Sequence, residues 1–402
     1  MRRIAVFTGN RAEYGLLLPI IRQIHDDPSL TLLLLVSGAH LDSEFGNTID
    51  SITQSGFDIS AQIAIELKDD DLYSTAIAIG TGIQNVAKEL KKLKPDVLVV
   101  YADRFEGLSA VVAAAQMGIA VAHIEGGDMT EGGALDDSVR HAMTKLSHLH
   151  FTTNEIASKN VIQMGEAPWR VTTAGLPSID SILQGELATQ GDIIAKWGID
   201  PSQPIVVFTQ HSVATEYDES DTQITESLKA LGSLLVQGVQ LFITYPNNDA
   251  GGKRIVSHLK NFAKSAAGKV VLVPSLGGKM YHGLLALAQS PDNRVVCVGN
   301  SSSGIKETPI FGCPTVNIGT RQAGRLRAEN VIDVTYSRDA IEHAILTCLY
   351  DEDFRQTCRQ TKNPYGDGQA AMRILNVLKT VSLDKALIAK KHIFNAAPCG
   401  DK

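Results

Sequence analysis

Cysteine is scarce in this sequence, and its few copies form no metal or redox motif. The 402 residues include five cysteines, none in a Cys-x-x-Cys pair and none beside histidines at the spacing of a zinc site. This pattern argues against a zinc-binding framework and predicts buried or incidental thiols in a reducing compartment. The five are Cys297, Cys313, Cys348, Cys358 and Cys399.

A basic surface and a long apolar segment are also missing. The formal net charge is −7, which argues against nucleic acid and anionic membranes as partners, because both favour basic surfaces. A small anion could still bind in a locally basic pocket. The most apolar stretch, 108–124, is interrupted by Ser109, Gln116 and His123 and predicts a helix and a strand rather than a membrane span. The first residues enter a strand without the apolar core of a signal peptide, so we expect a cytoplasmic protein.

What the sequence does contain is a repeated alternation of short apolar runs and helical patterns. Runs such as 32–36 and 97–100 are continuously apolar, which is typical of parallel strands buried on both faces. The alternation weakens between 177 and 204, where we place a linker, and then starts again. It predicts two doubly wound α/β domains. The strand candidates are 3–8, 30–36, 96–101, 119–124, 148–152, 170–174, 204–209, 239–244, 269–273, 294–298 and 314–318.

The turn after the first strand has features of an anion site. Gly9 allows a tight turn, and the helix that follows offers free backbone N–H groups to an anion. Arg11 adds a charge that suits phosphate. The alternative is an ordinary strand-to-helix turn with a surface arginine. The turn matches neither a Gly-x-Gly-x-x-Gly fingerprint nor a phosphate-binding Walker loop.

Three carboxylates follow neighbouring first-half strands, at the sheet edge where open parallel sheets bind ligands. Asp103, beside Arg104, follows the strand at 96–101, and Glu125 follows the next one. Asp136 opens a later helix, where it could simply cap that helix. Each segment alone is compatible with a salt-bridged loop. Together they favour catalysis, because crowded like charges raise one another's pKa toward neutral pH.

In the second half, a serine-rich turn gives the strongest signal for a nucleotide. Ser301, Ser302 and Gly304 follow the strand at 294–298 and precede a helix, forming a neutral cradle for a diphosphate. Glu307, one turn further, is placed to accept hydrogen bonds from ribose hydroxyls. The alternative is a serine cap with a capping-box glutamate.

Three further residues follow second-half strands and complete the candidate set. His211 can serve as an acid, a base or a donor to phosphate, although a lone histidine is more often structural. Asn247 and Arg321 follow the strands at 239–244 and 314–318.

Five segments together resemble the hydrolysing UDP-N-acetylglucosamine 2-epimerases, enzymes that open sialic-acid-type pathways. The resemblance extends from about residue 3 to the helix beyond Gly368 and is most distinctive at 136–145. It implies the GT-B architecture, which has two Rossmann-like domains, an interdomain cleft and a C-terminal helix that crosses back to the first domain. We therefore expect an N-terminal domain at 1–183 joined by a helix at about 366–382, a C-terminal domain at 184–365, and a frayed tail at 383–402. The five segments are 8–15, 103–106, 123–150, 299–307 and 319–322.

The resemblance also implies the chemistry, which uses no metal and no redox cofactor. A base removes the proton at C2 of the sugar, UDP leaves from C1, and water adds to the resulting 2-acetamidoglycal. Asp103, Glu125 and Asp136 match the acid/base carboxylates, and His211 matches the catalytic histidine. Either Asp103 or Glu125 would take the C2 proton. The substrate-binding residues transferred in the same way are Arg11, Arg104, Asn247, Ser301, Ser302, Gly304, Glu307 and Arg321. Dimers are common in the family, so we expect a homodimer or a higher oligomer.

The identity of the sugar stays open. The connection 128–135 is longer than in many related epimerases and lies near the expected sugar position. A UDP-linked 2,4-diacetamido-2,4,6-trideoxy sugar, as in the legionaminic acid route, is therefore an alternative to UDP-N-acetylglucosamine. A GT-B glycosyltransferase and a non-catalytic sugar-nucleotide sensor are the other readings. The presence of all three carboxylates argues against both, and the missing Gly-x-Gly-x-x-Gly motif argues against a dehydrogenase.

Overall fold

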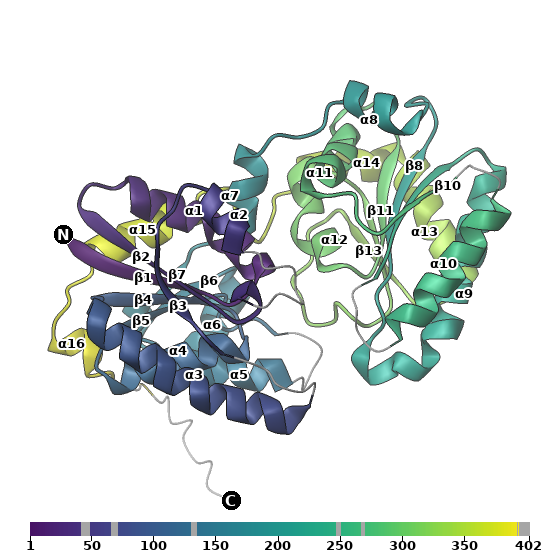
Figure 1. Cartoon of the computed structure of the whole chain (residues 1–402). Helices are drawn as coiled ribbons and strands as arrows, with labels where there is room; N and C mark the ends of the chain where they lie inside the picture. Colours follow the sequence, from purple (N-terminus) through teal and green to yellow (C-terminus); the bar gives the residue numbers. More distant parts are fainter. Residues whose placement is uncertain are drawn as a thin grey trace, which may run out of the picture. The chain divides into compact units, whose positions relative to one another are not determined.

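A seven-stranded and a six-stranded sheet, both entirely parallel, form the framework of the chain (Figure 1). The computed structural model describes residues 1–41, 49–65, 71–129, 135–246, 251–266, 270–391 and 393. They divide into two units. Unit 1 takes up the chain as far as Leu183 together with the C-terminal residues from Tyr365, and unit 2 runs from Gln184 to Pro364.

Unit 1 contains the seven-stranded sheet, in the order β3-β2-β1-β4-β5-β6-β7. Its strands are β1 (Arg2–Thr8), β2 (Leu30–Ser37), β3 (Ile59–Ile63), β4 (Val97–Tyr101), β5 (Ala120–Ile124), β6 (Leu149–Thr152) and β7 (Val171–Thr173). Its helices are α1 (Arg11–Asp26), α2 (Ile49–Gln54), α3 (Leu72–Leu93), α4 (Phe105–Gln116), α5 (Leu135–Leu146), α6 (Glu155–Gln163), α7 (Pro177–Gln184), α15 (Ala370–Thr380) and α16 (Lys385–Ile388).

Helices cover both faces of this sheet. Along β1, Ile4 and Val6 point into a core shared with α1 and α15, whereas Ala5 and Phe7 point into a core shared with α3 and α4. The C-terminal helix α15 belongs to the first of these cores, where its Ile374 side chain is fully buried. Two buried faces explain why the strands are continuously apolar.

Unit 2 contains the six-stranded sheet, in the order β10-β9-β8-β11-β12-β13. Its strands are β8 (Ile205–Thr209), β9 (Gln240–Thr244), β10 (Val270–Val273), β11 (Val295–Gly299), β12 (Thr315–Ile318) and β13 (Val331–Val334). Its helices are α8 (Gln190–Trp197), α9 (Ser220–Val236), α10 (Gly252–Ser265), α11 (Gly278–Ala286), α12 (Ser302–Lys306), α13 (Arg338–Tyr350) and α14 (Glu352–Gln360).

The predicted fold class is confirmed, since both units are Rossmann-like and every strand candidate corresponds to a strand. Two edge strands, β3 and β13, were not predicted. The boundary between the two units lies between Leu183 and Gln184, inside the linker expected at 177–204, but that stretch also contains helices α7 and α8. Helix α8 forms because Thr189 and Asp192 make a capping box and Ile193 is fully buried.

The frayed tail expected after Leu383 is wrong for residues 384–391. Leu387 on α16 is 1% exposed and belongs to the core of unit 1. Arg170 holds this segment by donating to the Leu387 carbonyl at 2.8 Å and the Ala386 carbonyl at 2.6 Å. Residues 394–402, with Cys399, lie outside the described part of the chain.

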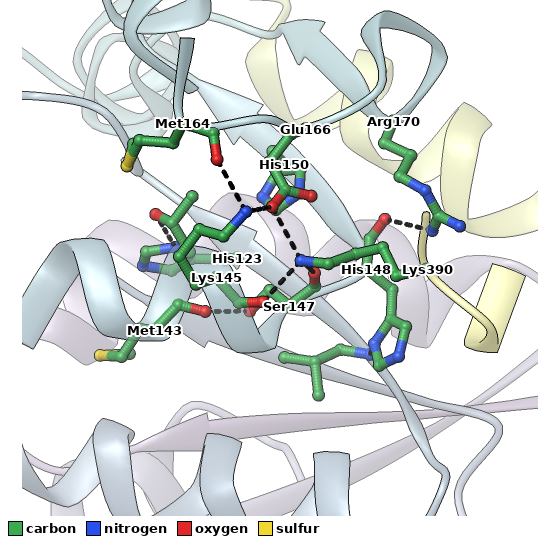
Figure 2. Close-up of polar contacts among 12 residues, drawn as sticks. His123, Met143, Lys145, Ser147, His148, His150, Met164, Glu166, Arg170 and Lys390 are labelled. Carbon is green, nitrogen blue, oxygen red and sulfur yellow. Dashed lines mark hydrogen bonds and ion pairs between the residues drawn. The ribbon is translucent and has the colours of Figure 1, made fainter. Parts of the chain in front are cut away.

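A buried ion cluster fixes the same segment (Figure 2). The Glu166 carboxylate is fully buried and accepts from Lys145 at 2.6 Å, from Lys390 at 2.9 Å and from His150 at 3.1 Å. Lys390 also donates to the carbonyls of Lys145 at 2.6 Å and Ser147 at 2.8 Å. Burial alone would raise the pKa of Glu166, but the hydrogen bonds from His150, Lys145 and Lys390 lower it to about 2.

Candidate active site

The backbone of unit 1 is unusual where β4 and β5 end. Ala102 and Glu125 adopt left-handed conformations, with φ of 55° and 65°. Side chains make this region unfavourable by about 1–2 kcal/mol per residue, so such positions are concentrated at functional sites. Both residues stay in the hydrogen-bonded ladder, since Ala102 N donates to Ile124 O and Glu125 N donates to Phe151 O, each at 2.9 Å. The predicted acids Asp103 and Glu125 therefore lie at strained turns whose backbone is fixed by hydrogen bonds to the neighbouring strands.

Arg140 on α5 binds two carboxylates of the candidate site in unit 1. Its guanidinium donates to Asp103, to Asp137 Oδ1 at 2.9 Å and to the Asp128 carbonyl at 2.7 Å. The Arg140 side chain is only 5% exposed. Since Asp137 and Arg140 lie three residues apart on one helix, their pairing follows directly from helical spacing.

Asp103 is electrostatically coupled to the other two predicted carboxylates. Burial raises the pKa of Asp103, Arg140 opposes that rise, and the charges of Glu125 and Asp136 add to it, so the pKa lies above its ordinary value. Burial and the nearby Glu125 raise the pKa of the Tyr101 hydroxyl well above its usual range. Asp103 therefore interacts electrostatically with both other predicted carboxylates. Glu125 is buried, whereas Asp136 is exposed.

A second acidic pair lies at the carboxyl end of β1. Arg104 donates to Glu106 through two nitrogens, at 3.0 and 3.2 Å, and Glu106 is 2% exposed. Glu13 on α1 accepts from Gly9 N at 2.6 Å. Burial is the main cause that raises the pKa of Glu13 to about 8, and the charge of Glu106 contributes. Glu13 is therefore largely protonated at neutral pH.

Unit 2 has a polar pocket of about 440 Å³ at the carboxyl end of its sheet. It includes four of the predicted residues, namely His211, Ser301, Ser302 and Arg321. Burial and the charge of Arg321 lower the pKa of His211 to about 4, so its ring is neutral at pH 7. The other lining residues are Thr209, Thr244, Tyr245, Pro246, Pro274, Ser275, Leu276, Gly277, Gly278, Tyr281 and Ser303.

Asn300 holds the wall of this pocket together. Its side chain accepts from His211 N at 2.7 Å and donates to His211 O at 2.9 Å. Its carbonyl accepts from Gln322 at 2.9 Å and from Arg321 at 3.2 Å. The preceding Gly299 is required at a φ of 129°, where a side-chain Cβ would lie 1.9 Å from the Thr209 carbonyl oxygen.

Two of the predicted nucleotide residues, Glu307 and Gly304, are not among the residues that line this pocket. Glu307 is bonded to His282 at 3.0 Å. Gly304 is buried against β12, where an added Cβ would approach the Thr315 methyl group to 3.3 Å. Ser301 caps α12, as the alternative interpretation of this turn expected, but Glu307 is the C-cap residue of that helix rather than a capping-box partner.

Three predictions fall on parts that the structure leaves undescribed. Asn247 and residues 130–134 of the long connection lie outside the described residues. Arg11 begins helix α1, but its side chain is not described. In the described part of the chain, no group of three or more His, Cys, Asp or Glu side chains is placed to hold a metal ion, and no helix is long and apolar enough to cross a membrane.

The described cysteines are free and buried, and burial raises the pKa of their thiols; they are Cys297, Cys313, Cys348 and Cys358.

Comparison with known proteins identifies the family. The model of the UDP-N-acetylglucosamine 2-epimerase family matches residues 22–379. The chain belongs to the UDP-N-acetylglucosamine 2-epimerase family. It is 33% identical to a Legionella pneumophila protein named UDP-N,N'-diacetylbacillosamine 2-epimerase (hydrolyzing), over 98% of this chain and 100% of that protein. It is 30% identical to a Neisseria meningitidis protein named UDP-N-acetylglucosamine 2-epimerase, over 88% of this chain and 90% of that protein.

A solved structure of this epimerase family shows the same fold. The crystal structure of a UDP-GlcNAc 2-epimerase from Neisseria meningitidis bound to UDP-GlcNAc matches with a TM-score of 0.75 and 18% identity, over 94% of this chain and 99% of that one. The two Rossmann-like domains are therefore of the GT-B-like type found in the epimerase family.

Sequence reasoning missed several residues that organise the candidate site of this epimerase-family chain. Most of them contact predicted residues, whereas Tyr281 contacts Ser303 and Glu13 contacts Gly9. Five of the missed residues lie inside the segments that carry the family resemblance, and the helical spacing of Asp137 and Arg140 was the signal that could have found that pair. The missed residues are Glu13, Tyr101, Glu106, Asp137, Arg140, Tyr281 and Asn300.

Proposed function

We propose that the chain is a hydrolysing 2-epimerase that converts a UDP-linked 2-acetamido sugar into the free epimerised sugar and UDP. A carboxylate takes the C2 proton, the C1–O bond breaks with its electrons leaving on UDP, and a 2-acetamidoglycal results. Water then supplies a hydroxyl to C1, and a proton returns to C2 from the opposite face. The observation that carries the proposal is Asp103, whose pKa lies above its ordinary value beside Glu125 and Asp136. A base with a raised pKa suits proton removal near neutral pH.

Asp103 and Glu125 are the candidates for the C2 base. Asp103 is held by Arg140, and Glu125 lies two residues after the fully buried His123. Asp103 directly follows the left-handed residue Ala102, and Glu125 is itself left-handed. A backbone fixed in this way favours proton transfer over a constant distance. We assign Asp136, the exposed acid, to the proton that returns to the glycal.

We propose that unit 2 binds the UDP group. His211, Ser301, Ser302 and Arg321 line one pocket, where a neutral histidine, two hydroxyls and a guanidinium suit a diphosphate. Because its ring is neutral, His211 can donate one hydrogen bond to the leaving phosphate. Glu307, Gly304 and Asn247 would complete the nucleotide site, and Arg11 and Arg104 of unit 1 would contact the phosphates.

Our first candidate for the substrate is UDP-2,4-diacetamido-2,4,6-trideoxyglucose, also called UDP-N,N'-diacetylbacillosamine. The Legionella pneumophila relative named for that substrate is 33% identical to this chain over 100% of the relative's length. UDP-N-acetylglucosamine, which would yield N-acetylmannosamine, is the second candidate, favoured by the Neisseria meningitidis relative at 30%. We further propose a cytoplasmic homodimer, to be checked by light scattering.

The deciding experiment is proton NMR of the purified protein in D2O with each of the two UDP sugars. The proposal expects release of UDP and a free sugar that carries deuterium at C2. A protein that releases UDP only when a sugar acceptor is present would be a glycosyltransferase instead. Binding without turnover of either substrate would point to a sensor and contradict the proposal.

A substitution of Asp136 tests the proton donor. Asp136→Asn keeps the shape of the side chain but cannot give or take a proton. Turnover should be lost while the affinity for UDP stays within a few-fold, because UDP is assigned to unit 2. Unchanged turnover would remove Asp136 from the reaction. Ser138→Ala, at an exposed position on the same helix, is the matched control.

A further inference from the structure

The His123 ring joins three separate segments of unit 1. It lies on β5 and is fully buried. Its Nε2 is 2.7 Å from the Ala102 carbonyl oxygen, and its Nδ1 is 3.1 Å from Thr144 Oγ1 on α5. Ala102 is the left-handed residue directly before Asp103. One imidazole therefore contacts the peptide that sets the direction of the Asp103 side chain.

The partners of the ring fix its protonation and its tautomer. Burial is the main cause that lowers the pKa of His123 to about 3, so the ring is neutral at pH 7. A carbonyl oxygen can only accept, so Nε2 carries the single proton and donates it to Ala102. Nδ1 must then accept the hydroxyl proton of Thr144. The hydrogen bond from Thr144 thus selects the tautomer that holds Ala102.

The following residues of the chain leave space for this bridge. A Cβ at Gly126 would lie 2.8 Å from Thr144 Oγ1 and 3.0 Å from His123 Nδ1, at the hydrogen bond itself. Arg140, which binds Asp103 directly, lies one helical turn before Thr144 on α5. Helix α5 therefore holds Asp103 twice, once through Arg140 and once through Thr144 and His123.

We propose that His123 is a positioning residue for the reaction, and that with Thr144 it holds the strained Ala102 turn so that Asp103 keeps its catalytic direction. This inference rests on the proposed role of Asp103 as an acid/base group. His123 acts on the substrate only through Ala102 and Asp103, and Thr144 acts only through His123.

The test compares Thr144→Val, which has nearly the same shape but no hydroxyl, with Thr144→Ser, which keeps the hydroxyl. T144V should lower kcat about 10- to 100-fold, as expected for a catalytic group displaced by about 1 Å. KM and the affinity for UDP should stay within twofold, and T144S should stay near wild type. Ser147→Ala, which removes another buried hydroxyl bonded to Met143 O at 2.7 Å, is the control. S147A should keep the wild-type kcat.

Amide hydrogen exchange of the segment 101–104, measured without substrate, gives a readout that does not depend on activity. Exchange should be faster in T144V than in T144S and S147A. Wild-type kcat in T144V, or unchanged exchange, would overturn the proposal. If wild-type protein turns over neither UDP sugar, the proposed function fails, and the exchange comparison alone decides whether Thr144 and His123 hold the turn.

A second pair of variants covers the case in which T144V does not fold. His123→Gln keeps an N–H group that can reach the Ala102 carbonyl, whereas His123→Leu has none. H123Q should retain at least tenfold more kcat than H123L at equal UDP affinity. Equal loss of kcat in the two variants would show that the ring contributes only packing.

Discussion

Lys390→Met is the sharpest test of how the C-terminal segment is held in unit 1. The substitution keeps most of the aliphatic volume and removes the ammonium group. Lys390 makes three hydrogen bonds, to the carbonyls of Lys145 and Ser147 and to Glu166 (Figure 2). Its side chain is 10% exposed, so little water is available to replace these bonds.

The expected cost follows from what remains after the change. Removing one partner from a buried ion pair costs about 3–5 kcal/mol when the other charge is left uncompensated. Here Lys145 and His150 still bind Glu166, so the cost lies at the lower end, at about 3 kcal/mol. For a domain of this size, 1 kcal/mol corresponds to about 2–4 °C in Tm, so unit 1 should melt about 6–12 °C earlier.

Differential scanning calorimetry measures this shift, with Lys379→Met as the matched control. Lys379 lies on α15 and pairs with Asp27 at 2.5 Å, but its side chain is 37% exposed. Solvent weakens such surface pairs, so K379M should shift the Tm only slightly. A difference in Tm of about 2 °C corresponds to at most about 1 kcal/mol. If K390M melts within about 2 °C of K379M, the ion cluster around Glu166 does not hold the C-terminal segment in place.

Three further changes test the two candidate sites. Glu13 keeps its proton in the folded protein up to about pH 8 but loses it near 4.5 when unfolded, so wild-type stability should fall as pH rises between these values. The free energy of unfolding of Glu13→Gln, measured with denaturant, should therefore rise relative to that of wild type between pH 5 and pH 8. A difference in unfolding free energy that does not change with pH would contradict the raised pKa of Glu13. Arg140→Gln removes the charge that lowers the pKa of Asp103, so the acid limb of the kcat/KM profile should move to higher pH; an unmoved limb would exclude Asp103 as the titrating base. Glu307→Ala should weaken UDP binding by about 1–3 kcal/mol in calorimetry; unchanged affinity would leave Glu307 a structural partner of His282.

The central strands could be predicted from sequence because burial on two faces leaves a strong local pattern. Residues 32–36 lie inside β2, which pairs with β1 on one side and β3 on the other, and their apolar run is unbroken. The missed strands β3 and β13 lie at sheet edges and contain polar residues such as Gln62 and Asp333. Each pairs with one neighbour only, so its burial is weaker and its pattern less distinct.

The site was predictable to the extent that each residue follows a strand, and unpredictable where it depends on a distant partner. Asp103 and Glu125 were found because the carboxyl ends of parallel strands meet at one edge. Nothing local marks Lys390 as buried, because its partner Glu166 lies 224 positions earlier in the chain. The same holds for Asn300, which braces His211 across 89 positions.

The return of the chain to unit 1 has a consequence for synthesis on the ribosome. All strands of unit 2 lie between Gln184 and Pro364, so they have all been made once translation reaches Pro364. Unit 1 starts first but still lacks α15 and Lys390, which cover its core and its buried Glu166. Domains generally fold as units once they have emerged. The second unit should therefore finish folding before the first, and a stop codon between Pro364 and Lys390 would leave the N-terminal unit without Lys390 and open to proteases and chaperones.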